Sequence, residues 1–81
     1  MTVRVKLFAR ARDVIGADCV SVTVPQPTTV AGLRRALCDQ FPAMLPISAG
    51  LLFAVDAKYA GDTTPISSNA DIACFPPVSG G

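Results

Sequence analysis

The sequence predicts an α+β domain in which one main helix packs on one face of a mixed, four- to five-stranded sheet. Two segments of alternating apolar and polar residues precede a single segment with helical spacing, and short apolar runs follow it. The 81 residues are 51% hydrophobic and 16% charged. A chain of this length forms one domain, and this composition supplies a core and excludes a disordered chain.

The first two strands are expected at residues 2–9 and 19–24. In both segments apolar side chains alternate with polar ones, which is typical of a strand with one buried face. By this alternation Val5 faces the core and Phe8 faces the opposite side. The residues between the strands predict a short helical turn, Arg10 to Ile15, followed by the connection of an antiparallel pair.

The main helix is expected to begin after Thr28 or Thr29, because either is a suitable N-cap. Pro42 ends it at about Phe41. Arg34 and Arg35 lie away from its apolar stripe. The side chains of that stripe recur at helical spacing, at Val30, Leu33, Leu37 and Phe41.

The second half of the chain predicts three further strands around a loop at residues 43–50. Leu51 to Val55 is an apolar run suited to a buried strand, and Lys58 to Ala60 is expected to pair with it. Asp71 to Phe75 is the last strand, and Pro76-Pro77 end it. A helix between the second and third strands of this order fits the β-grasp arrangement.

The charge pattern argues against nucleic-acid binding. Seven basic and six acidic residues give a net charge of +1 and are interspersed, whereas binding to a phosphate backbone needs a clustered positive field. The densest basic spot, Arg10 with Arg12, is either a solvated segment or a partner contact. No apolar run approaches the ~20 residues that span a membrane. We expect a cytoplasmic protein that binds neither nucleic acid nor membranes.

The cysteines predict no metal chemistry. Cys19, Cys38 and Cys74 are widely spaced, and the chain contains no histidine. A disulfide framework needs paired cysteines, and a zinc site needs four ligands at characteristic spacing. We therefore expect no metal site, no cofactor bound by the chain itself, and buried, inert thiols. The absence of histidine removes the commonest general base, so any chemistry must be simple or must use a partner's residues.

The C-terminal residues carry the strongest functional signal. We expect a β-grasp domain at residues 1–76 and a flexible tail at residues 77–81 that ends in Gly80-Gly81. This ending suits a carrier whose terminal carboxylate is the reacting group. Five residues beyond Pro76 reach roughly 16 Å at full extension, and a narrow channel can close around glycine, which has no Cβ. An ordinary frayed terminus is the alternative.

Two segments resemble the small-subunit family of molybdopterin synthases, which are ubiquitin-like β-grasp proteins. These are residues 75–81, Phe-Pro-Pro-Val-Ser-Gly-Gly, and residues 7–16, Leu-Phe-Ala-Arg-Ala-Arg-Asp-Val-Ile-Gly. The resemblance spans nearly the whole chain. It departs at Asp56, where many family members have asparagine after the third strand.

The resemblance implies a function and two partners. An adenylyltransferase related to ubiquitin-activating enzymes would use ATP to adenylate Gly81, which is then converted to a thiocarboxylate (1-thioglycine); Gly80 gives unhindered access. The sulfur would pass to cyclic pyranopterin monophosphate on the large subunit and build the dithiolene of molybdopterin. The complex would be a heterotetramer of two small and two large subunits. The chain would be the sulfur-donating subunit of a sulfurtransferase, with no independent catalytic site.

An exposed aromatic patch is expected on the outer face of the sheet. If the first and last strands pair in parallel, as in β-grasp proteins, Phe8 and Phe75 share the face opposite Val5, and Tyr59 borders it. Scattered apolar surface residues without a role are the alternative. The candidate partner contacts are Phe8, Arg12, Tyr59, Phe75, Pro76, Pro77 and Val78.

Three other functions stay open. The first is a sulfur carrier for thiamine or another thiolated product, which Pro76-Pro77 disfavours. The second is a ubiquitin-like modifier joined to lysines through Gly81; with only Lys6 and Lys58 in the chain, building chains on itself would have few acceptors. The third is a plain interaction domain with an incidental Gly-Gly end.

Overall fold

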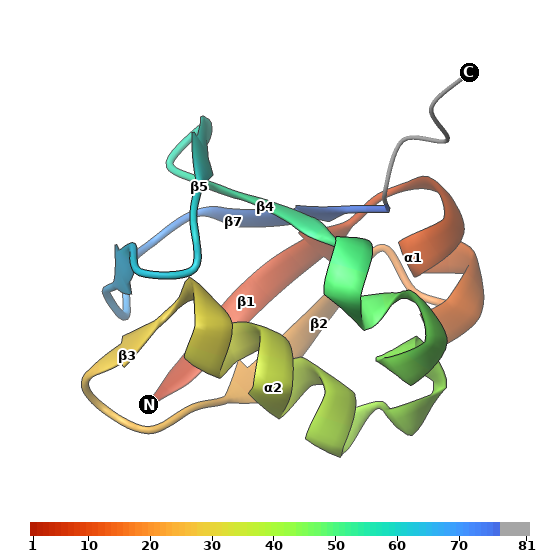
Figure 1. The fold of residues 1–81 in the computed structure, drawn as a ribbon, viewed down its shortest axis with the longest axis horizontal. Helices are drawn as coiled ribbons and strands as arrows, with labels where there is room; N and C mark the ends of the chain where they lie inside the picture. Colours follow the sequence, from red (N-terminus) through yellow and green to blue (C-terminus); the bar gives the residue numbers. More distant parts are fainter. Residues whose placement is uncertain (77–81) are drawn as a thin grey trace.

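The computed structural model describes residues 1–76, and residues 77–81 lie outside the described part. The order of strands and helices along the chain is close to the order that the sequence predicts (Figure 1). The elements are β1 (Thr2–Leu7), α1 (Ala9–Ile15), β2 (Cys19–Thr23), β3 (Thr28–Thr29), α2 (Val30–Gln40), the 3₁₀ helix η1 (Pro42–Gly50), β4 (Leu52–Val55), β5 (Lys58–Ala60), β6 (Pro65–Ile66) and β7 (Ile72–Phe75).

The main sheet has the strand order β2-β1-β7-β4-β5. β1 pairs with β2 in antiparallel register and with β7 in parallel register, while β4 pairs with both β7 and β5 in antiparallel register. The sheet is therefore mixed, and its single parallel pair among the described residues joins the first strand to the last. The prediction of a mixed, four- to five-stranded β-grasp sheet is confirmed, and the sheet has five strands.

The core lies between the sheet and α2. Figure 1 shows α2 and the green helical segment that follows it on the same side of the sheet. Side chains at alternate positions of β1 point into this layer, as the alternation predicts, and they meet the apolar stripe of α2. The largest fully buried side chains are Val3, Val5, Val22, Val30, Leu33, Leu37, Met44, Leu51, Phe53, Ile72 and Cys74.

The short helix α1 forms where the sequence predicts a helical turn. β1 ends at Leu7 rather than at residue 9. Phe8 N still donates to Cys74 O at 3.2 Å, but the chain then turns into α1. Gly16 ends α1 in the left-handed region, with φ of 82°. That conformation favours glycine, and Gly16 N donates to Arg12 O at 2.7 Å.

Three segments differ from the prediction. Residues 43–50 form most of η1 rather than a loop, because Pro42 suits a helix start and the buried Met44 anchors the turn against the core. Pro46 lies inside this helix, and no helical stripe marks it in the sequence. Residues 28–29 and 65–66 also pair as β3 and β6, which form a separate two-stranded sheet beside the start of α2.

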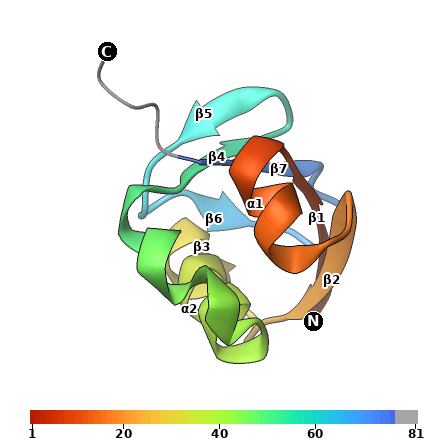
Figure 2. The same cartoon turned by 90° about the vertical axis from the view of Figure 1, so that its right-hand side faces the viewer.

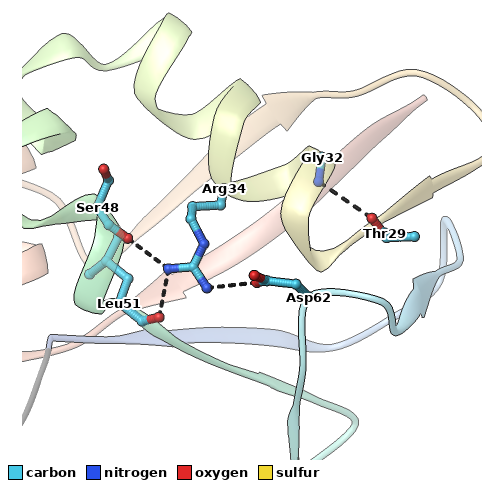
Figure 3. A network of polar contacts seen from close by, with 6 residues as sticks. All are labelled: Thr29, Gly32, Arg34, Ser48, Leu51 and Asp62. Atoms are coloured by element: carbon cyan, nitrogen blue, oxygen red, sulfur yellow. Dashed lines mark hydrogen bonds and ion pairs between the residues drawn. The ribbon is translucent and has the colours of Figure 1, made fainter.

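The N-terminus of α2 has a tight local arrangement. Thr29 is the N-cap, and its hydroxyl oxygen accepts a hydrogen bond from Gly32 N at 3.5 Å (Figure 3). A Cβ at position 32 would collide with the hydroxyl oxygen of Thr28. The glycine inside the helix is therefore required by the neighbouring Thr28, which is buried.

Arg34 joins four parts of the fold, although it lies away from the apolar stripe of α2. Its guanidinium donates to Ser48 O at 2.6 Å and to Leu51 O at 2.8 Å, and it contacts Asp62 Oδ1 at 3.0 Å (Figure 3). The guanidinium carbon also lies 5.2 Å from the ring centroid of Phe53. Arg34 thus connects α2 with the end of η1, the start of β4 and the segment before β6.

We expect Arg34→Ala to lower the free energy of unfolding by about 2–3 kcal/mol, because it leaves two carbonyl groups without their charged donor. Arg35→Ala is the matched control on the same helix, since Arg35 is exposed, and it should change stability by less than about 0.5 kcal/mol. Urea denaturation of both variants measures the difference. Equal effects would show that the Arg34 contacts do not stabilise the fold.

Candidate functional site

The outer face of the sheet, opposite α2, carries the candidate site. Alternation places Phe8 at the end of β1 on this face, while its neighbour Leu7 is buried. In β7 the same alternation buries Cys74 and turns Ala73 and Phe75 outward. Because β1 and β7 are parallel neighbours, with Leu7 opposite Cys74, the two phenylalanines follow at the same end of the sheet.

Three aromatic side chains form one patch there. The rings of Phe8 and Phe75 are stacked, with centroids 4.9 Å apart and planes at 10°. Tyr59 of β5 lies at 6.1 Å from Phe75 in a tilted arrangement. Phe8 is 42% exposed and Tyr59 is 76% exposed. We call these three residues the aromatic face, and its position on the outer side of the sheet agrees with the sequence prediction.

A hollow of about 320 Å³ lies between the aromatic rings. Its floor is made of alanine side chains, among them Ala54 and Ala73, which are direct partners across β4 and β7. Lys6 and Asp71 line its polar side and form an exposed ion pair at 3.7 Å. The arrangement is an apolar depression with a charged rim, which suits an apolar side chain of a partner.

Leu52 extends this apolar surface and was not predicted to do so. It lies directly opposite Phe75 on β4 and is 41% exposed. The sequence run Leu51–Val55 is continuously apolar, so it predicts a buried strand without showing which side faces out. The strand begins at Leu52 and buries Phe53, which fixes Leu52 on the outer face.

The turn at Asp56-Ala57 holds the β4–β5 hairpin that carries Tyr59. Both residues have positive φ, 52° and 69°, as two-residue hairpin turns require. Asp56 N donates to Asp71 O at 2.8 Å, and Asp56 Oδ1 accepts from Asp71 N at 2.9 Å. The aspartate therefore forms this turn and also connects it to the start of β7.

Arg12 lies beside the aromatic face rather than within it. It belongs to α1, and its guanidinium forms an exposed ion pair with Asp18 at 3.7 Å. It lines a second hollow, between α1 and the β1–β2 hairpin, to which Phe8 also contributes. The candidate contacts Phe8 and Arg12 are thus brought together around one end of β1.

Among the candidate site residues at the C-terminal end, the structure describes those up to Pro76. Pro76 directly follows Phe75 and is half-buried. Pro77, Val78, Gly80 and Gly81 lie outside the described residues, so their assigned roles stay predictions.

The described residues contain three free cysteines and no cluster of metal-ligating side chains. Cys38 and Cys74 are buried and Cys19 is half-buried, and all three are free thiols. Burial raises the pKa of Cys74 to about 12, although the charge of Arg34 opposes the shift. Within residues 1–76, no group of three or more histidine, cysteine or acidic side chains is arranged to hold a metal ion. None of the helices in this part of the chain is long and apolar enough to cross a bilayer.

Comparison with known protein families shows to which family this chain belongs. The ThiS family matches residues 5–81. The chain belongs to the ThiS family. This match covers nearly the whole chain, includes the aromatic face and extends through Gly80-Gly81, so it agrees with the resemblance found in the sequence.

Individual relatives agree with this assignment. The chain is 34% identical over 83 residues to the molybdopterin synthase sulfur carrier subunit of Caenorhabditis briggsae, covering 100% of this chain and 99% of that protein. It is similar to the crystal structure of SAMP1 from Haloferax volcanii, with a TM-score of 0.82, 27% identity and complete coverage of both chains. The Helicobacter pylori complex of subunits 1 and 2 of molybdopterin-converting factor contains a chain of the same fold, with a TM-score of 0.66, 21% identity and complete coverage of both chains.

The raised pKa of Cys74 predicts a specific pH dependence of stability. In the unfolded chain the thiol ionises near 9.0, whereas in the folded protein it keeps its proton up to about 12. The unfolded state therefore loses this proton first, and stability falls as pH rises through this window, by at most about 1.4 kcal/mol per pH unit.

Urea denaturation of the parent protein and of Cys74→Ala across this window measures the effect. The variant is less stable at neutral pH because it leaves a small cavity, but its stability should fall less steeply above pH 9.0. Parallel curves for the two proteins would contradict the prediction.

Proposed function

We propose that this protein is the sulfur carrier subunit of a molybdopterin synthase and that the carboxylate of Gly81 carries the sulfur. The ThiS family match through residue 81 supports this proposal, as does the end-to-end similarity to a relative with that name. The activity is that of the assembled synthase, to which this chain contributes the sulfur-donating end.

One observation carries the proposal: the aromatic face lies where the described chain ends. Phe75 joins the ring stack, and Pro76 follows it directly. A partner that binds the aromatic face is therefore close to the residues that come next. The five residues 77–81 span roughly 16 Å when fully extended, so a partner's catalytic groups must lie within about that distance of Pro76.

The proposed chemistry begins with activation of Gly81. A carboxylate oxygen attacks the α-phosphorus of ATP on a ubiquitin-activating-enzyme-like adenylyltransferase, and pyrophosphate leaves. This step is needed because a free carboxylate is a poor electrophile, whereas an acyl adenylate carries AMP as a leaving group. Sulfide delivered by a partner's sulfur donor then attacks the acyl carbon and displaces AMP, which leaves a thiocarboxylate on Gly81.

In the second stage the sulfur leaves the carrier. The thiocarboxylate sulfur attacks a carbon of cyclic pyranopterin monophosphate on the large subunit and displaces an oxygen substituent of that carbon. Water then cleaves the acyl–sulfur bond and returns Gly81 to a carboxylate. The sulfur is ionised at neutral pH, so it needs no base from this chain, which contains no histidine. Two deliveries supply both sulfur atoms of the dithiolene, in keeping with the proposed heterotetramer of two small and two large subunits.

A protein modifier is the second candidate, because the similarity to SAMP1, a small archaeal modifier protein, extends over both complete chains. In that function a lysine amine of a target would displace AMP from Gly81 in place of sulfur. The first stage is the same, so the fate of the activated Gly81 separates the two functions.

Deleting Gly81 is expected to abolish sulfur transfer and to change the free energy of unfolding by less than about 0.5 kcal/mol. The full chain, incubated with the activating enzyme, ATP and a sulfur donor, should gain the mass of one sulfur replacing one oxygen, and the shortened chain should not. Gly81→Ala is the milder variant, since its Cβ must enter a channel shaped for glycine. A shortened chain that still supports molybdopterin formation, or activated Gly81 found only on target lysines, would contradict the proposal.

Phe8→Ala and Phe75→Ala are each expected to weaken binding to the large subunit by about thirtyfold, or ~2 kcal/mol, because buried aromatic anchors dominate interfaces. Leu45→Ala is the matched control, since Leu45 is 60% exposed on η1, outside the aromatic face. Calorimetric titration against the large subunit measures affinity, and thermal melts of the free variants measure stability. Unchanged affinity together with a large drop in melting temperature would assign both rings to folding instead of docking.

A further inference from the structure

β2 forms one margin of the main sheet. Within residues 1–76 it pairs with β1 on one side and has no strand on the other, and Figure 2 shows it along the right-hand margin of the molecule. A free strand edge presents backbone N–H and C=O groups that another chain can bind. The register of the β1–β2 pair decides which residues of β2 present them.

The backbone of β2 alternates between the two sides. Just beyond β2, Val24 exchanges two hydrogen bonds with Met1, at 2.8 and 3.1 Å. At the other end, Leu7 N donates to Asp18 O at 2.7 Å. Even-numbered residues from 18 to 24 therefore point their backbone groups at β1, and the odd-numbered residues Cys19, Ser21 and Thr23 point theirs at the free edge.

Gln40 closes one end of this edge. Thr23 N donates to Gln40 Oε1 at 3.0 Å, and Gln40 Nε2 donates to Thr23 O at 2.8 Å. The side-chain amide of α2 thus occupies the place that a peptide group of a neighbouring strand would take. No backbone partner exists in residues 1–76 for the N–H and C=O of Cys19 and Ser21. The open edge therefore consists of four groups on these two residues.

The surface beside the open edge carries three basic side chains, of which Lys6 forms an exposed ion pair with Asp71 and Arg12 one with Asp18. Arg4 and Lys6 project from the outer face of β1, and the guanidinium of Arg4 reaches across to β2, where Arg4 Nη2 lies 3.5 Å from Cys19 Sγ. These two residues and Arg12 line a hollow of about 430 Å³ in which Asp18, paired with Arg12, is the one acid. Phe8 and Leu7 supply apolar lining.

We infer that the free edge of β2 binds an extended, acidic peptide segment of a protein partner as an additional strand. The backbone of the segment bonds to Cys19 and Ser21, and Gln40 sets the end of the pairing. Its outward side chains lie next to the guanidinium of Arg4, which favours acidic residues there. A second copy of this chain is a poorer occupant, because pairing two β2 edges brings two sets of the same positive charges together.

This surface shares Phe8 and Arg12 with the proposed large-subunit contacts, but it involves neither Gly81 nor Phe75, so peptide binding can be measured apart from sulfur transfer. The probe is a blocked peptide of three Glu-Val repeats, and the matched probe has lysine in place of glutamate. We expect the acidic peptide to bind the full chain at least tenfold more tightly at low salt, and added salt to weaken it. In NMR spectra the amide protons of Cys19 and Ser21 should exchange more slowly with solvent when the peptide is bound.

Two variants test the two parts of the surface. Ser21→Pro removes an edge N–H without removing a bond to β1, because that N–H points outward, and it should reduce peptide binding at least tenfold. Arg4→Glu should reverse the preference between the two peptides, whereas Arg35→Glu, an exposed site on α2, should weaken the acidic peptide by less than threefold. Melting curves of each variant establish that the fold is kept.

Three results would overturn the inference. The first is no binding of the acidic peptide, or equal binding of both peptides. The second is acidic-peptide binding that Ser21→Pro and Arg4→Glu both leave unchanged. The third is a concentration-dependent dimer of the free chain that Ser21→Pro abolishes, which would assign the edge to a second copy.

Discussion

The parallel pairing of β1 with β7 is the contact on which the other parts of this structure depend. It connects the N-terminal hairpin to the last strand, although nearly the whole chain lies between them. Side chains of both strands alternate in phase, so one side of the pair supplies buried residues such as Val5 and Ile72 to the core. The other side brings Phe8 and Phe75 into contact. Folding of the core and assembly of the aromatic face are therefore consequences of the same register, and a shift by one residue would exchange the two faces.

A single charged side chain, Arg34, connects α2 with the segments on either side of the β4–β5 hairpin. The segment from α2 to β4 runs through the 3₁₀ helix η1, which belongs to neither sheet. Arg34 compensates by binding carbonyl groups at Ser48 and Leu51 and the carboxylate of Asp62. These acceptors lie 14 to 28 positions away in the sequence. The start of β4, and with it the outward direction of Leu52, is therefore held both from the helix and by the pairing of Leu52 with Phe75 of β7.

How far the sequence predicts this structure depends on how local each signal is. Alternation and helical spacing correctly predict the β1–β2 hairpin, the stripe of α2 and the outward direction of Phe8, because these depend on neighbouring residues. The 3₁₀ helix η1 carries no spacing signal, and the two-residue strands β3 and β6 are too short to show one. The helical spacing predicts that Arg34 lies away from the apolar stripe of α2. That is correct for the Cα of Arg34, but its guanidinium reaches back to two backbone carbonyl groups and a carboxylate that are distant in the sequence. Gly80 and Gly81 are predicted from their residue types and the family resemblance alone.

The alanines beneath the aromatic rings have a consequence for how selectivity is encoded. Ala54 and Ala73 face each other across β4 and β7 and form part of the floor of the hollow. The hollow is deep because these two side chains are single methyl groups. A larger side chain at either position would fill the space between Phe75 and Tyr59. The shape of the hollow that a partner contacts thus depends on two of the smallest side chains that line it, Ala54 and Ala73. Two carriers with identical aromatic rings could therefore recognise different partners through a difference of one or two methyl groups.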